Sequence, residues 1–97
     1  KLVAVLEEGG HRLPDEGQVT VPQALARPDF VYRLPESPVA VFVDGPHHGD
    51  AHQALRDLQA QYRLEDLGWL VVRFPHDADW GKIIAAHPNV FGPGRGR

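Results

Sequence analysis

The chain has 97 residues, of which 42% are hydrophobic and 24% are charged, with a formal net charge of −3. This length favours one small domain with a modest core, and the absence of cysteine excludes disulfides and thiolate zinc sites. No apolar run approaches the roughly 20 residues of a membrane-spanning helix, so we expect no membrane insertion and a cytoplasmic location. The chain begins with Lys1 and turns apolar at once, from which we expect a piece of a longer protein.

The first part of the chain predicts one helix and one edge strand. Residues 2–8 are mostly apolar and precede two glycines, which is typical of a helix that stops in a left-handed turn, although so short an apolar run could also form a strand. Residues 18–21 alternate between polar and apolar side chains, as an exposed or edge strand does, and Pro22 should end that strand.

Two further strands are predicted on either side of a short turn that is bracketed by prolines. The first runs through residues 30–32, and the proline before Asp29 favours extended backbone at its start. The second is the run 39–43, whose residues are all apolar. A strand that is apolar on both faces suits the centre of a sheet with helices above and below.

An acidic residue lies where each of these strands begins or ends. Asp29 precedes the first strand, and Asp44 follows the second. Folded as a hairpin, the strands would bring the two carboxylates near one another, with His47 and His48 just beyond. Two carboxylates and a pair of imidazoles at one edge of a sheet predict a metal and proton-transfer site. The alternatives are that Asp29 is a turn or capping residue and that Asp44 belongs to an Asp-Gly turn.

The longest helix is predicted over residues 50–67, which contain no proline or glycine, with Asp50 as its N-cap. Five apolar residues at three-four spacing share one face of it: Ala51, Ala54, Leu55, Leu58 and Tyr62. Leu64 and Leu67 project nearly opposite that face. Either the helix is covered on two sides or it bends near Gln61.

The last part of the chain predicts a strand, a helix and a tail. Residues 69–74 should form a strand that returns through a helical crossover and therefore pairs in parallel. A short helix over residues 80–87, capped by Asp77 or Asp79, should follow. The order is αβββαβα, an α/β domain over residues 1–91, and the glycine-rich and arginine-rich residues 92–97 should be a flexible tail.

Several short segments, in this order, resemble the PD-(D/E)XK nuclease superfamily. They are Pro28-Asp29-Phe30, the strand end Val43-Asp44-Gly45, the histidine pair after it, and residues 67–74. Within the superfamily they are most similar to the very-short-patch-repair endonucleases and their relatives, small domains often attached to DNA-processing proteins such as superfamily 2 helicases. The resemblance covers roughly residues 1–90. It implies the restriction-endonuclease-like three-layer αβββαβα fold, with a central mixed four-stranded sheet flanked by helices.

The resemblance also implies a metal site and a reaction. Asp29 matches the principal metal-binding aspartate of the family, and the Val43 backbone carbonyl or Asp44 would complete the protein ligands. Mg²⁺ or Mn²⁺ fits such a site because these ions accept few protein oxygens and retain waters, one of which can attack a phosphodiester. DNA would be the substrate, and other domains of a longer parent chain would be partners.

The chain departs from the family pattern at the end of the third strand. The acid of the signature is replaced by Phe42 and its lysine by Asp44. In the very-short-patch-repair branch the first acid is likewise missing, and histidines after the strand serve in its place. This implies that His47 or His48 is the general acid or base.

Positive charge for DNA binding is expected from Arg27, Arg33 and Arg56. Neither of the two lysines, Lys1 and Lys82, lies in the sequence where the missing lysine of the signature would act. Two functions are therefore predicted. The first is a metal-dependent DNA endonuclease, and the second is a catalytically degenerate domain of the same fold that binds nucleic acid or a protein.

Overall fold

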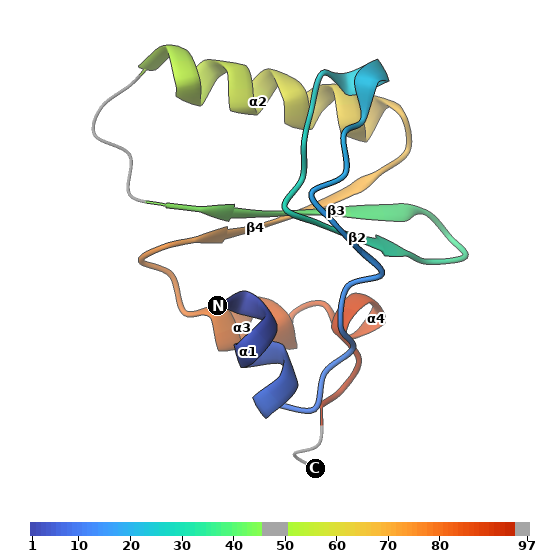
Figure 1. The fold of residues 1–97 in the computed structure, drawn as a ribbon, viewed down its shortest axis with the longest axis vertical. Helices are drawn as coiled ribbons and strands as arrows, with labels where there is room; N and C mark the ends of the chain where they lie inside the picture. The colour runs from blue at the N-terminus through green and yellow to red at the C-terminus, as the bar shows by residue number, and fades with distance from the viewer. Residues whose placement is uncertain (46–50, 95–97) are drawn as a thin grey trace.

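The computed structural model describes residues 1–45 and 51–94, which form three layers (Figure 1). A four-stranded sheet lies between helix α2 on one face and helices α1, α3 and α4 on the other. In chain order the elements are α1 (Leu2–Glu8), β1 (Glu16–Gly17), the 3₁₀ turn η1 (Pro22–Ala24), β2 (Phe30–Arg33), β3 (Pro38–Asp44), α2 (Ala51–Asp66), β4 (Leu70–Pro75), α3 (Trp80–Ala85) and α4 (Pro88–Phe91).

The sheet is mixed, with the strand order β1-β2-β3-β4. The first three strands pair antiparallel, and Phe30 lies opposite Val41. β4 pairs in parallel with β3, and Leu70 lies opposite Val39, because the connection through α2 returns the chain to the same end of the sheet. The predicted α/β class and mixed four-stranded sheet are therefore confirmed.

Strand β3 separates two hydrophobic clusters, one on each face of the sheet. Val39 and Val41 belong to the cluster under α1, α3 and α4, whereas Ala40 belongs to the cluster under α2. All three side chains are fully buried. This confirms the prediction that residues 39–43 form a central strand covered on both sides.

The edge strand predicted at residues 18–21 is wrong. The strand in this part of the chain is β1, at Glu16–Gly17. It cannot continue, because Gln18 adopts a left-handed backbone with φ of 51°. Val21 instead makes an isolated bridge to Ala26 and is buried in the cluster under α2.

The orientation expected for α2 is also wrong. Three large side chains of its predicted core face are exposed, Leu55 by 54%, Leu58 by 43% and Tyr62 by 56%. The residues that meet the sheet are Ala60 and Leu64, in the C-terminal half of the helix. α2 runs without interruption over 16 residues, so neither a bend nor a second covering layer is needed. The predicted cap Asp50 lies outside the described residues.

The two ends of the chain are helical. α1 forms as a helix, which settles the alternative of a strand. Of the two aspartates predicted as caps, it is Asp79 that begins α3, and its carboxylate accepts from the Lys82 N–H at 3.3 Å. α4, which contributes the buried Val90 and Phe91, was not predicted. Of the expected tail, residues 92–94 are described and residues 95–97 are not.

In the part of the chain described, none of the helices combines the length and hydrophobicity that crossing a bilayer requires.

The orientation of α2 can be tested with two leucines of the same helix. Leu64→Ala should lower the free energy of unfolding by about 2–5 kcal/mol, because Leu64 is fully buried and its loss leaves a cavity. Leu55→Ala should change it by less than about 0.5 kcal/mol, because this side chain is exposed. Urea unfolding measures both, and equal costs would contradict the observed orientation.

Candidate functional site

Asp29 lies directly before β2, where backbone pairing between β2 and β3 ends. Its N–H donates to the Val41 carbonyl at 2.9 Å, and its carboxylate Oδ2 accepts from the Val43 N–H at 2.7 Å. A charged acceptor makes a stronger hydrogen bond to a backbone donor than a neutral one does. The half-buried carboxylate is therefore fixed against the edge of β3.

The Val43 carbonyl points to the same edge. In an extended strand the N–H and C=O of one residue face the same neighbouring strand, so this carbonyl faces the side on which Asp29 lies. Asp29 and Val43 line one hollow of about 240 Å³, together with Lys1 and Gly17. A carboxylate and a backbone carbonyl are the hard oxygen ligands that suit Mg²⁺ or Mn²⁺.

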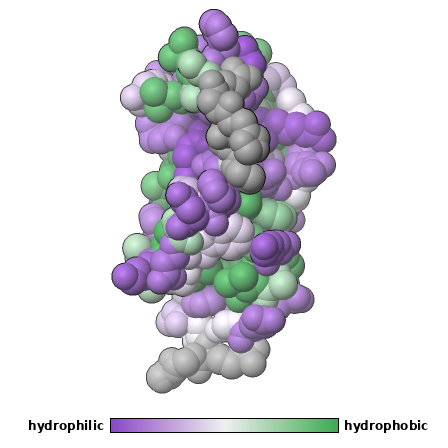
Figure 2. All heavy atoms as spheres, turned by 90° about the vertical axis from the view of Figure 1, so that its left-hand side faces the viewer, coloured by the Kyte–Doolittle hydropathy of each residue, from purple (hydrophilic) through white to green (hydrophobic). Residues whose placement is uncertain are grey.

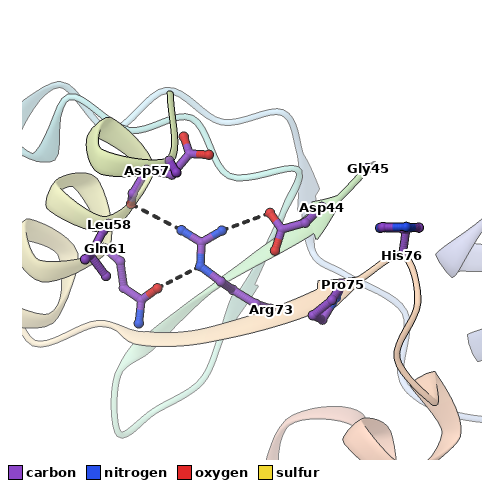
Figure 3. Close-up of a pocket in the computed structure, with 9 residues that line it drawn as sticks. Asp44, Gly45, Asp57, Leu58, Gln61, Arg73, Pro75 and His76 are labelled. Atoms are coloured by element: carbon purple, nitrogen blue, oxygen red, sulfur yellow. Dashed lines mark hydrogen bonds and ion pairs between the residues drawn. The ribbon is translucent and has the colours of Figure 1, made fainter. Parts of the chain in front are cut away.

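Asp44 is bound by Arg73 (Figure 3). The Nη1 group of Arg73 donates to Asp44 Oδ1 at 2.9 Å. Its Nε donates to Gln61 Oε1 at 2.7 Å, and its Nη2 donates to the Asp57 carbonyl at 3.2 Å. The guanidinium also lies 4.6 Å from the centroid of the Phe42 ring. One arginine of β4 thus joins the end of β3 to the middle of α2.

Asp29 and Asp44 both lie at the end of β3, but their carboxylates have different partners. Asp44 is the last residue of β3 and directly follows Val43, to which Asp29 is bonded. Asp44 lines a hollow of about 530 Å³ that shares Lys1 and Val43 with the hollow lined by Asp29. Figure 2 views the side of the molecule at which β3 ends, where hydrophilic and hydrophobic residues are interleaved. Within residues 1–45 and 51–94, three or more His, Cys, Asp or Glu side chains do not gather into a metal-binding group.

The predicted histidines His47 and His48 lie outside the described residues. Lys1, by contrast, was missed. This residue lines both hollows at the end of β3, because α1 packs its buried Leu2 and Leu6 against the sheet. No local pattern could have indicated this, since Lys1 and Val43 are distant in the sequence.

The three arginines predicted to bind DNA are not gathered at the site. Arg27 lines a hollow of about 250 Å³ with Asp29, and its Nη2 donates to Gln18 at 3.3 Å. Arg56 lies on α2 and donates to Gln53 at 3.0 Å. Arg33 ends β2, whereas Asp29 precedes it, so the rise of the strand separates them by roughly 13 Å. Arg33 therefore lies at the far end of β2 from Asp29.

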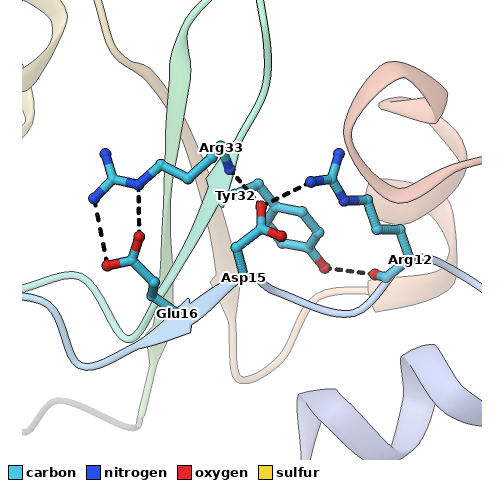
Figure 4. Close-up of polar contacts among 5 residues, drawn as sticks. All are labelled: Arg12, Asp15, Glu16, Tyr32 and Arg33. Carbon is cyan, nitrogen blue, oxygen red and sulfur yellow. Dashed lines mark hydrogen bonds and ion pairs between the residues drawn. The ribbon is translucent and has the colours of Figure 1, made fainter.

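Arg33 belongs to a separate polar cluster at the edge of the sheet (Figure 4). Its Nε donates to Glu16 at 2.6 Å, its backbone N–H donates to Asp15 at 2.6 Å, and Arg12 donates to Asp15 at 2.7 Å. The Arg33 N–H and Arg12 hold the pKa of Asp15 below its ordinary value of 3.8. The Arg33 side chain likewise lowers the pKa of Glu16. Asp15 and Glu16 therefore compensate the positive charge of Arg33, which was expected to bind DNA phosphate.

No family model matches the chain, and neither a curated protein nor a solved structure matches it. Similarity therefore assigns neither a family nor an activity, and the geometry at the end of β3 is what supports a function.

The Arg73 network predicts a stability effect. Arg73→Met should lower the free energy of unfolding by about 1–3 kcal/mol, because the Asp44 carboxylate and two further acceptors lose their donor. Arg73→Lys should fall between wild type and Arg73→Met, since an ammonium keeps the charge but cannot reach all three acceptors. Arg56→Met, on the exposed side of α2, is the control and should cost less than about 0.5 kcal/mol. A cost for Arg73→Met as small as that of the control would contradict the network.

The Asp15 cluster predicts a pH dependence. The folded pKa of Asp15 lies below the unfolded value near 3.8, so its stabilisation is present above pH 3.8 and is lost as the pH falls through the folded pKa. Asp15→Asn should therefore have a lower Tm than wild type near neutral pH, and the difference should shrink on acidification below pH 3.8. Thermal unfolding across this range measures it, and a difference that does not change with pH would show that the Asp15 charge is not what stabilises the cluster.

Proposed function

We propose that the chain is a metal-dependent DNA endonuclease-like domain of the PD-(D/E)XK superfamily and a module of a larger cytoplasmic DNA-processing protein, such as a helicase. The order of elements supports this. With the short η1 and α4 set aside, the elements follow one another as αβββαβα. A mixed sheet between two helical layers is what the restriction-endonuclease-like fold requires.

The observation that carries the proposal is the hydrogen bond between Asp29 and Val43. It holds a carboxylate beside a backbone carbonyl at the end of the central strand, in a hollow open to solvent. These are two of the protein oxygens that the resemblance implies for the metal. Lys1 lines the same hollow, and a positive charge at this place would attract a phosphate group.

The residues present fit Mg²⁺ or Mn²⁺, because both ions accept a small number of hard oxygen ligands. When bound, such an ion would neutralise charge on the phosphate and activate a water molecule. Asp29 and the Val43 carbonyl would hold it, and Asp44 would lie next to this pair. His47 or His48 is proposed as the general acid or base. Arg27, next to Asp29, is proposed to contact the DNA backbone.

A second candidate function is binding without catalysis, to nucleic acid or to a protein. The specific observation in its favour is that Arg73 contacts both Phe42 and Asp44, the residues that replace the acid and the lysine of the signature. Its guanidinium covers the Phe42 ring and pairs with Asp44, so both residues stabilise packing between β3, β4 and α2. If the domain had lost its catalytic activity, residues at these two positions would be expected to make structural contacts of this kind.

The nuclease proposal is tested with Asp29→Asn. The asparagine amide oxygen can still accept from the Val43 N–H, so the strand edge should persist while the negative charge is lost. We expect nicking of supercoiled plasmid by wild type in Mg²⁺ or Mn²⁺, no nicking in EDTA, and a loss of at least about 100-fold in the variant. Gel quantification of nicked plasmid gives the rates.

The matched control is Asp66→Asn, an exposed carboxylate at the end of α2, which should nick as wild type does. Nicking by Asp29→Asn at the wild-type rate, or wild-type nicking that persists in EDTA, would refute the site. Absence of nicking by wild type with every metal, together with DNA binding that Asp29→Asn leaves unchanged, would favour the binding function.

A further inference from the structure

We propose that the hollow between Asp44 and Trp80 binds a nucleobase of the DNA strand, with preference for a base that carries an exocyclic amino group. The choice of DNA as ligand rests on the proposed function. The hollow has a volume of about 530 Å³ and lies where the end of β3, the segment after β4 and the start of α3 meet. Sites that hold small organic molecules have volumes of about 300–1,000 Å³.

The position of the hollow suits a base next to the reacting phosphate. Lys1 and Val43 line both this hollow and the one that contains Asp29. A strand whose phosphate meets Asp29 and Lys1 would therefore have a neighbouring base at the mouth of the larger hollow.

Trp80 provides a fixed aromatic surface in this hollow. Its Nε1–H donates to the Pro75 carbonyl at 2.7 Å, and its ring packs against Phe74 in a T-shaped contact at 5.7 Å. The side chain remains half-buried and lines the hollow. Because these contacts already hold the ring, stacking with a base would cost little additional side-chain entropy, and stacking is available to every base.

The polar groups of the hollow select among ligands. Asp79 lines the hollow and uses one carboxylate oxygen for the Lys82 N–H. Its second oxygen makes no hydrogen bond within the described part of the chain and can accept from a base amino group, as carboxylates accept from cytosine N4. The Asp44 carboxylate is turned to the α2 face of the sheet, where it pairs with Arg73. Cytosine, adenine and guanine carry the amino group, and thymine does not.

Fluorescence of Trp80 tests this inference without any catalysis. The protein is the Asp29→Asn, Trp69→Phe double variant in EDTA, in which Trp80 is the one remaining tryptophan of the two in the chain. Single-stranded oligo-dC should quench its emission and bind several-fold more tightly than oligo-dT of the same length. A strand of the same length built from abasic residues should leave the emission unchanged. Equal quenching by the abasic strand, or no quenching by any base, would overturn the inference.

A second variant fills the hollow without removing a core contact. Ala78 lines the hollow, so Ala78→Leu should weaken oligo-dC binding by about tenfold or more while Tm stays the same. Ala85→Leu, exposed on α3, is the matched control and should bind as the parent does. Equal binding by the two variants would overturn the proposal. Plasmid nicking by wild type without base-dependent quenching would refute the hollow alone, and quenching without nicking would refute the nuclease activity alone.

Discussion

The hydrogen bond from the Val43 N–H to the Asp29 carboxylate is the contact on which the candidate site depends. Backbone pairing between β2 and β3 stops at Phe30 and Val41, and the Asp29 side chain takes over the next donor of β3. The same contact stabilises the strand edge and presents a charged oxygen beside a backbone carbonyl. A capping role and a ligand role are thus compatible in one residue, because a carboxylate has more acceptor sites than one N–H can use.

Local sequence patterns correctly predicted those helices and strands that depend mainly on residues close in sequence. The apolar strand β3, the long helix α2 and an aspartate cap for α3 were all predicted correctly, since each depends on neighbours in sequence. The choice of Asp79 over Asp77 as the cap came from the structure. The face that α2 turns to the sheet was not, because its sequence offers apolar residues on two sides. The sheet covers only the part of the helix around Ala60 and Leu64, and this overlap depends on where the strands end.

The site was predictable to the extent that it lies on one hairpin. Asp29 and Val43 meet because β2 and β3 are joined by a short turn, and their separation in sequence is small enough for a hairpin to be inferred. Lys1 and Arg73 reach the same end of the sheet through the packing of α1 and the parallel pairing of β4. The positions of these two residues cannot be inferred from the periodicity or the spacing of residues in the sequence.

The two carboxylates at the end of β3 differ most in the charge that surrounds them. Asp44 is paired with the Arg73 guanidinium, and both side chains are about a quarter exposed, so much of its negative charge is compensated. Within the described residues Asp29 has a neutral backbone donor and no ion pair. A divalent cation would therefore gain more from approaching Asp29 than from approaching Asp44.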